Sequence, residues 1–324
     1  DADIAEEIAR FYGYNKIESR LLNGCATTLG SRNRKQKIQD RIRKQMTGMG
    51  YNEMLTFSFI SPSVFNKLNL PEDCKLRDAV IIENPLGEDY SVMRTTMMPS
   101  FLESVANNYA HRVEAASLFE ISYVYVKTDK YPDELPEHRE MLTFGGYAAN
   151  GKADFFEFKG DIEALLEALK ITKYEFEPEK EIAFMHPGRT ARLFVGGKDA
   201  GIFGQIHPAV AKKWGCPDNT MVAMLRTDVL IANVTDIPKN KELPKFPAVT
   251  RDIAVVLDAD VPAGHVEKLI RQRGGKALET CTLFDCYIGA QVPEGKKSLA
   301  YALAFRDATR TLTDEDVNKF MKKI

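Results

Sequence analysis

Apolar residues recur at helical spacing in two stretches near the start of the chain. Ile4, Ile8 and Phe11 are separated by four and three residues, which predicts an amphipathic helix over residues 3–12 that ends at Gly13. A second helix is predicted over residues 32–49, with an apolar stripe formed by Ile38, Ile42, Met46 and Met49. The polar stretch between the two helices is typical of a linker, so we expect the first helix to be the end of a preceding domain.

Beyond residue 50, strand-like and helix-like patterns follow one another without a regular rhythm. Strands are predicted at 118–126, 141–148, 191–195 and 200–206, and helices at 98–112, 158–169 and 208–213. A doubly wound parallel sheet needs strands and helices in strict alternation, which this pattern lacks. The pattern therefore favours an α+β fold with a mainly antiparallel sheet.

The chain changes character at residues 234–247, which contain three prolines and little hydrophobic pattern, as is typical of a domain boundary. The elements predicted beyond it are a strand at 251–257, a helix at 263–273, strands at 278–288 and 298–306, and a helix beginning at Thr313. Thr313 and Asp316 have the spacing of a capping box. This β-α-β-β-α order predicts a ferredoxin-like domain that lacks its last strand, so the edge of its first strand is expected to be open.

Composition and charge exclude several classes of protein. The 324 residues carry a formal net charge of −2, so bulk positive charge cannot bind nucleic acid and any RNA contact must be local. No apolar run approaches the roughly 18 residues of a membrane span, and the first residues do not have the pattern of a signal peptide. The five cysteines form neither a CxxC pair nor a cluster with histidine, which favours a reducing cytoplasm and argues against structural zinc.

The predicted helix at 32–49 is strongly basic over most of its length. Seven basic residues and one acidic residue lie between Arg32 and Lys44. Such a helix can bind RNA, but a solvated helix face is the commoner reason for this composition.

The last predicted strand supplies the best argument for a binding surface. Its large residues alternate with small ones, so one face of the sheet is expected to pack on helices and the other to carry alanines and Ser298. The first strand repeats this alternation, with Ala254 on the small side. In the strand at 278–288, Phe284 and Ile288 are expected to point inward, which turns Tyr287 outward onto the same small-residue face.

An open sheet face with small side chains and one tyrosine lets a nucleobase lie flat and stack, an interaction worth about 1–3 kcal/mol. Arg251, Arg306 and Arg310 are predicted to reach phosphates from the rim of this face. The same alternation also describes a sheet face that is buried against another domain. The pattern alone supports both interpretations equally.

Three acidic residues share one face of the first predicted helix. Asp3, Glu6 and Glu7 are placed so that their carboxylates can converge on a hard cation such as Mg²⁺. Acidic residues in a first helical turn also favour the helix dipole by about 0.3–1 kcal/mol each without any metal. Their spacing alone favours the second explanation.

Motifs of self-contained catalytic centres are absent from the sequence. There is no GxxxxGK[ST] or GxGxxG phosphate loop, no HExxH zinc motif and no GxSxG nucleophile elbow. His186 and His207 each precede a proline at a predicted turn, where a structural role is the commoner one.

Taken in order, short segments along the whole chain resemble the beta subunit of bacterial phenylalanyl-tRNA synthetase. In the first two thirds they are residues 3–17, Glu83-Asn84-Pro85-Leu86, Ser91-Val92-Met93-Arg94-Thr95, Leu118-Phe119-Glu120-Ile121, Phe156-Glu157-Phe158-Lys159-Gly160 and His186-Pro187-Gly188-Arg189. Beyond the proline-rich boundary they are Phe246-Pro247, Arg251-Asp252, residues 284–289, Lys297-Ser298-Leu299 and Arg310-Thr311-Leu312. No single motif carries the resemblance, which rests on their common order.

The resemblance implies a division of the chain into five parts. These are the helical end of a truncated preceding domain (1–20), a linker (21–30), a class II synthetase-like but catalytically inactive module (31–233), a second linker (234–247) and a truncated ferredoxin-fold anticodon-binding domain (248–324). A working class II site needs a late glycine-rich motif ending in arginine, which neutralises phosphate charge. That motif is absent from this sequence, so we expect no catalytic residue.

The resemblance also implies partners and cofactors. In this family the alpha subunit holds the active site and uses ATP, in a tetramer of two alpha and two beta chains. Asp3, Glu6 and Glu7 match carboxylates of a Mg²⁺ site shared with the alpha subunit, and a fourth carboxylate lies outside this chain. Ala254, Tyr287 and Ser298 match positions that meet the anticodon of phenylalanine tRNA, on the face that the alternation predicts.

The leading hypothesis is a non-catalytic beta-subunit fragment of phenylalanine–tRNA ligase, which scaffolds the alpha subunit and contacts the anticodon in the cytoplasm, with no role for DNA or a membrane. The alternative is a structural protein–protein interaction module without RNA contact. A third hypothesis, an enzyme that itself activates an amino acid, is opposed by the missing catalytic motifs.

Overall fold

The computed structural model describes residues 1–21, 30–149, 154–237, 240 and 243–324. Helix α1 (Ala2–Tyr12) confirms the first predicted helix and ends at Gly13, whose φ of 99° suits a residue without a side chain. The first predicted linker, 21–30, lies outside the described residues at 22–29. The second, 234–247, lies outside them at 238–239 and 241–242.

A large α+β module follows in the chain. It begins with α2 (Arg34–Gly48), on which Ile38, Ile42 and Met46 are buried as predicted. Its strands are β1 (Asn52–Glu53), β2 (Phe59–Ile60), β3 (Val92–Met93), β4 (Ala116–Val126), β5 (Glu137–Tyr147), β6 (Tyr174–Pro178), β7 (Met185–Val195), β8 (Lys198–Ile206) and β9 (Met221–Arg226). Its other helices are α3 (Val64–Lys67), α4 (Met98–Ala110), α5 (Phe155–Ala168), α6 (Pro208–Trp214) and α7 (Thr227–Asn233).

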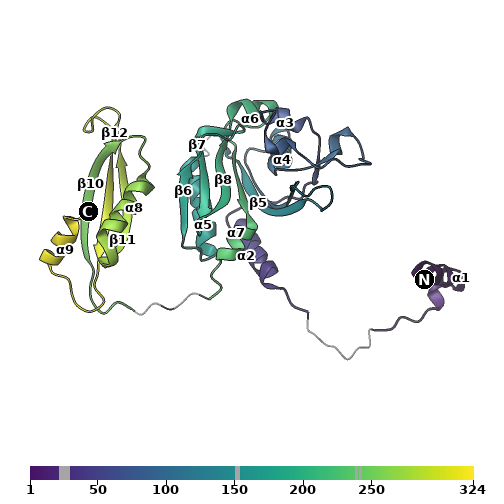
Figure 1. The fold of residues 1–324 in the computed structure, drawn as a ribbon, viewed down its shortest axis with the longest axis horizontal. Helices are drawn as coiled ribbons and strands as arrows, with labels where there is room; N and C mark the ends of the chain where they lie inside the picture. The colour runs from purple at the N-terminus through teal and green to yellow at the C-terminus, as the bar shows by residue number, and fades with distance from the viewer. Residues whose placement is uncertain (22–29, 150–153, 238–239, 241–242) are drawn as a thin grey trace. The chain divides into compact units, whose positions relative to one another are not determined.

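Seven of these strands form one sheet in the order β1-β4-β5-β9-β8-β7-β6. The strand β1 runs parallel to β4, and the other neighbours are antiparallel. The mainly antiparallel sheet predicted from the irregular order of elements is therefore confirmed. In Figure 1, α2 is drawn in purple and the later strands and helices of this module in blue to green.

Both faces of this sheet carry a hydrophobic core. On one face, Phe158 of α5 contacts the rings of Phe144 and Phe203, with centroids 5.5 and 6.5 Å away. On the other face, α4 and α6 pack on strand residues that include Val222 and Met224. Because successive strand residues point to opposite faces, the central strand β9 is buried on both sides.

Two adjacent glycines let the central strands of the sheet approach one another. Gly145 and Gly146 in β5 have φ angles of 150° and 152°, which side-chain-bearing residues rarely adopt. A β-carbon at Gly145 would overlap the backbone of Met221 in β9, and one at Gly146 would overlap the carbonyl oxygen of Ala116 in β4. The register of β5 therefore requires glycine at both positions.

The segment after Gly50 alternates in a strand-like way in the sequence, but little of it is strand in the structure. Only two residues of it pair as β1 and two as β2, and residues 54–58 between them belong to no strand. Leu55 and Phe57 in this stretch are 89% and 72% exposed. Their alternation with polar residues reflects a surface rather than a strand with one buried face.

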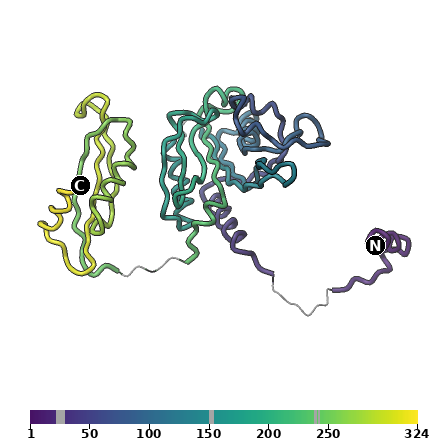
Figure 2. The backbone as a smooth tube through the Cα atoms, in the orientation of Figure 1, coloured from purple at the N-terminus to yellow at the C-terminus, as the bar shows by residue number. Residues whose placement is uncertain are grey.

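The C-terminal domain consists of β10 (Val249–Asp258), α8 (Ala263–Gly274), β11 (Leu278–Tyr287), β12 (Lys296–Phe305) and α9 (Asp314–Met321). Figure 2 traces this path as a tube. The three strands are antiparallel in the order β10-β12-β11, which confirms a ferredoxin-like unit without its last strand in residues 243–324. Within the described residues the outer edge of β10 has no strand partner.

The alternation in β12 builds the core of this domain. Leu299, Tyr301, Leu303 and Phe305 are at most 1% exposed and form a cluster with Val317 and Phe320 of α9 and Ile270 of α8. Both helices therefore cover the same face of the sheet. The opposite face carries the small residues of β12, as predicted.

We expect Gly146→Ala to lower the free energy of unfolding by more than about 3 kcal/mol, because the new β-carbon collides with backbone that the sheet cannot move cheaply. Urea unfolding of the chain measures this. Gly160→Ala is the matched control: Gly160 lies within α5 with nothing near its missing β-carbon, so alanine should be neutral or stabilise by about 0.5–1 kcal/mol. Equal urea midpoints for the two variants would contradict the close strand approach.

Candidate nucleic-acid interface

The helix-free face of the C-terminal sheet brings together three of the predicted site residues. Tyr287 in β11 lies directly opposite Ser298 in β12, and Ala254 in β10 lies opposite Ala300, the next residue of β12 on that face. Residues opposite one another in a sheet share a face, so all three belong to one surface. Tyr287 is 40% exposed, Ala254 is exposed and Ser298 is half-buried.

The rest of this face carries small and acidic side chains. Ala302 and Ala304 continue the row of small residues along β12, and Asp252 and Asp285 flank it from β10 and β11. Small side chains in the middle strand leave room for a planar group to approach the backbone. Tyr287 places a large aromatic ring at one end of this row.

Phe284 is predicted to point into the core, but the structure shows that it does not. A bulge shifts the register of β11 between Leu283 and Asp285, and Phe284 is the extra residue at the bulge, 58% exposed. Ile288, also expected inside, is 70% exposed. Tyr287 nevertheless lies on the predicted face, because its partner Ser298 is on that face.

The three predicted rim arginines lie elsewhere. Arg251 is opposite Leu303, on the face that the helices cover. Arg306 comes eight residues after Ser298, about 26 Å further along the strand direction. Each guanidinium group is paired with a carboxylate of this chain: Arg251 with Asp314, Arg306 with Glu279 and Arg310 with Asp316. The structure thus does not bring these arginines together with Tyr287, and their contact with phosphate stays a prediction.

Arg310 takes part in the start of α9. The capping box is confirmed: the hydroxyl of Thr313 accepts from the amide of Asp316, and the carboxylate of Asp316 accepts from the amide of Thr313. Arg310 Nη1 donates to the same carboxylate at 2.7 Å. Arg310 and the two hydrogen bonds from Thr313 together lower the pKa of Asp316 to about 2.

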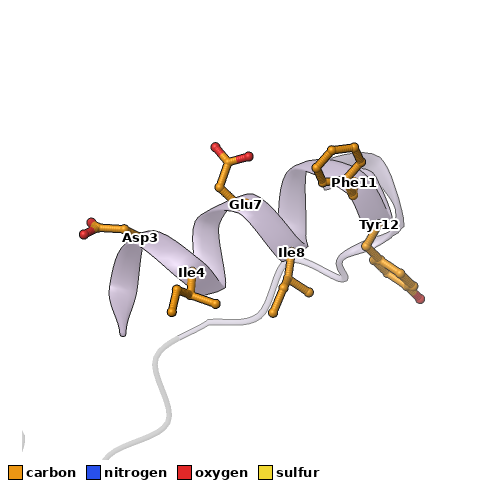
Figure 3. A pocket seen from close by; sticks show the side chains of 6 residues that line it. All are labelled: Asp3, Ile4, Glu7, Ile8, Phe11 and Tyr12. Atoms are coloured by element: carbon orange, nitrogen blue, oxygen red, sulfur yellow. The ribbon is translucent and has the colours of Figure 1, made fainter.

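The three predicted metal ligands lie on α1. Figure 3 shows the carboxyl groups of Asp3 and Glu7 directed away from the side chains of Ile4 and Ile8. Glu7 accepts from Arg10 at 2.6 Å, and within the described part of the chain no three acidic, histidine or cysteine side chains form a group that could hold a metal ion. The described residues therefore do not fit Mg²⁺ by themselves, and the shared site stays a prediction.

Arg94 is buried in the larger module, which the sequence pattern does not predict. It belongs to the segment Ser91-Val92-Met93-Arg94-Thr95, which carries part of the family resemblance. Arg94 and Glu120 are 0% and 2% exposed, with Arg94 Nη2 3.8 Å from Glu120 Oε1. Arg94 donates to the hydroxyls of Thr56 and Ser122 and to the Tyr123 carbonyl at 2.6–2.9 Å. Burial lowers the pKa of Arg94, and the neighbouring Glu120 opposes that change.

This buried network holds a segment whose apolar side chains face solvent. Thr56 donates its amide and its hydroxyl to the two oxygens of Glu120, and Arg94 donates to the carbonyl of Phe57. Phe57 and Leu55 remain exposed, and the ring of Phe57 meets Tyr90 edge to face with centroids 5.9 Å apart. Exposed apolar groups on a rigidly held backbone are typical of a protein–protein interface.

Comparison with known protein families gives two matches that together cover most of the chain. The model described as "Phenylalanyl tRNA synthetase beta chain CLM domain" matches residues 17–227, and "Ferredoxin-fold anticodon binding domain" matches residues 244–324. The second match covers the sheet that carries Tyr287. None of the helices in the described ranges has the length and apolar content needed to cross a bilayer.

The chain is also similar to beta subunits of phenylalanine–tRNA ligase. It is 43% identical to the one from Clostridium acetobutylicum over 322 residues and 44% identical to the one from Clostridium tetani over 324 residues. Each alignment covers 99% of this chain but 40% of the relative, so the chain spans about two fifths of the length of these relatives.

Among solved structures, the chain resembles a pyrrolysyl-tRNA synthetase from Desulfitobacterium hafniense, with a TM-score of 0.50 and 18% identity. The match covers 61% of this chain and 68% of that one. At this identity the similarity concerns the fold alone, and it agrees with the class II synthetase-like antiparallel sheet predicted from the sequence.

Acid should loosen the start of α9 through Asp316. Because the folded state lowers the pKa of this carboxyl to about 2, the stabilisation is complete above the unfolded pKa of about 3.9 and is lost as the pH falls toward 2. Hydrogen exchange of the α9 amides from pH 5 to pH 2 measures this loss. Asp316→Asn should exchange faster at pH 5 and show less change on acidification, and an identical pH profile for both proteins would contradict the assigned role.

Proposed function

This chain belongs to the family of phenylalanyl-tRNA synthetase beta chains, and from that premise we propose that it is a non-catalytic part of a phenylalanine–tRNA ligase. It contacts the tRNA anticodon and supports a catalytic alpha subunit, which attaches phenylalanine to the tRNA with ATP. We assign residues 31–233 to the inactive class II module and 248–324 to the anticodon-binding domain, with 1–20 as the end of a preceding domain. Protein synthesis in the cytoplasm is the corresponding setting.

The observation that carries the anticodon role is the open face of the C-terminal sheet. A base stacks on Tyr287, while Ser298 directly opposite offers a hydroxyl that both donates and accepts hydrogen bonds. Ala254 and Ala300 let the neighbouring sugar and base approach the backbone. Stacking on an aromatic ring supplies about 1–3 kcal/mol without a positive surface, which suits a chain of net charge −2.

The surface formed by Leu55, Phe57 and Tyr90 supports the scaffold role. The network of Arg94 and Glu120 holds its backbone in place, so little conformational freedom is lost when a partner covers it. We assign this surface to the alpha subunit, in a tetramer of two alpha and two beta chains.

The carboxylates of Asp3, Glu6 and Glu7 belong to the same proposal. They supply part of the ligand set for a Mg²⁺ ion that the alpha subunit and residues outside this chain complete. The ion would add positive charge between acidic groups of the two chains.

The alternative function is a protein-interaction module whose small-residue sheet face is covered by another protein domain. The exposure of Phe284, Tyr287 and Ile288 on or beside this face is the observation that favours it. Binding measurements with tRNA separate the two functions.

Tyr287→Ala in the full-length beta subunit, assembled with alpha, should weaken binding of phenylalanine tRNA by about 1–3 kcal/mol, or roughly 5- to 150-fold. The expected cause is the loss of base stacking, so the unfolding midpoint should stay unchanged. Leu269→Ala is the control, because this exposed leucine lies on α8 rather than on the open face. Unchanged affinity for Tyr287→Ala, measured by filter binding at fixed salt, would leave the alternative function as the better one.

Replacing both Leu55 and Phe57 with serine should weaken assembly with the alpha subunit by at least about 2 kcal/mol, roughly 30-fold, because central apolar anchors dominate protein interfaces. Sedimentation of the full-length subunits at several concentrations measures the change. Leu243→Ser is the matched control, since Leu243 and Leu55 are 90% and 89% exposed. If the double variant assembles like the control, the alpha subunit binds elsewhere.

A further inference from the structure

The ring of Tyr287 lies close to the backbone of Gly289, two residues further along the chain. A β-carbon at position 289 would be 2.6 Å from the phenol oxygen of Tyr287 and 2.8 Å from its Cζ atom. Both distances are shorter than a van der Waals contact. Any side chain at position 289 would therefore displace the ring from its present orientation.

The backbone at position 289 does not itself require glycine. Gly289 is not among the glycines with positive φ, in contrast to Gly275 and Gly295 of the same domain. For those two residues the conformation explains the absence of a side chain. At Gly289 the atoms nearest to a β-carbon belong to the ring of Tyr287. The missing side chain therefore matters for the position of that ring and not for the conformation of the turn.

The orientation of this ring decides what the open face can bind. Side chains prefer a few rotamers, and a ring that is pushed away from its position must adopt another rotamer or a strained one. Tyr287 is paired with Ser298 at the end of the small-residue row, so tilting its ring changes the space available to a base above Ser298. A base that stacks on the ring depends on that geometry.

We propose that Gly289 is a positioning residue for anticodon recognition, whose missing side chain lets the phenol of Tyr287 lie in the orientation that receives a base. This inference rests on the proposed function and adds a residue that does not touch the RNA itself. It predicts that Gly289 and Tyr287 act as one unit.

The test is a double-mutant cycle in full-length beta assembled with alpha, with phenylalanine tRNA as the ligand and filter binding at fixed salt. Gly289→Ala alone should weaken binding by about three- to tenfold, a part of the stacking contribution. In the Tyr287→Ala background the same change should have no further effect, because no ring remains to be displaced. Gly264→Ala is the control, since Gly264 has nothing near its missing β-carbon.

Unfolding midpoints of the same variants supply a readout without RNA. Gly289→Ala should lower the midpoint slightly in the presence of Tyr287 and not in its absence. This comparison keeps the test decisive even if the single variant is less stable, because the double variant relieves the collision.

Each outcome separates the two proposals. If Tyr287→Ala does not weaken binding, the proposed function fails and the positioning role fails with it. If Tyr287→Ala weakens binding but Gly289→Ala does not, or if the two effects multiply, only the positioning role is overturned. Loss of affinity in Gly289→Ala that disappears in the Tyr287→Ala background supports it.

Discussion

The larger module depends on satisfying one buried arginine. A guanidinium group without access to water must have its donors paired, because an unpaired buried charge costs several kcal/mol. Arg94 meets this requirement by joining residue 56, the strand β4 and Ser100 of α4, which are far apart in the sequence. Removing either Arg94 or Glu120 would leave the other buried charge without its ion-pair partner. The need to pair both charges holds residue 56, β4 and α4 in one arrangement.

The C-terminal domain reaches a defined surface by another route. Its sheet has helices on one face, and the large residues of β12 fill the space between sheet and helices. Since alternate residues of a strand point to opposite faces, the same alternation that builds this core leaves the other face with alanines and Ser298. Core and candidate RNA surface are thus two sides of one strand, and a change of register would exchange them.

The two candidate interfaces differ in chemistry. The surface of Leu55 and Phe57 is apolar and held by buried charges, which suits a protein partner. The open sheet face carries small residues, a tyrosine and two aspartates, and it lies apart from the paired arginine Arg306 at the other end of the sheet. Under the proposed function, recognition there would depend on stacking and close approach rather than on attraction between opposite charges.

Local periodicity was enough to predict β12, the capping box at Thr313 and the shared face of Ala254 and Ser298, because period-two and period-3.6 patterns arise from backbone geometry within a few residues. Tyr287 lies on the predicted face for another reason, since the bulge at Phe284 and not the alternation of Phe284 and Ile288 turns it there. Features that depend on contacts between residues far apart in the sequence were decided only by the tertiary structure. The strand β9 was not predicted, since burial on both faces removes its alternation. The bulge at Phe284, the carboxylate partners of the arginines and the burial of Arg94 likewise follow from strand pairing and packing, which join positions that no short stretch of sequence contains.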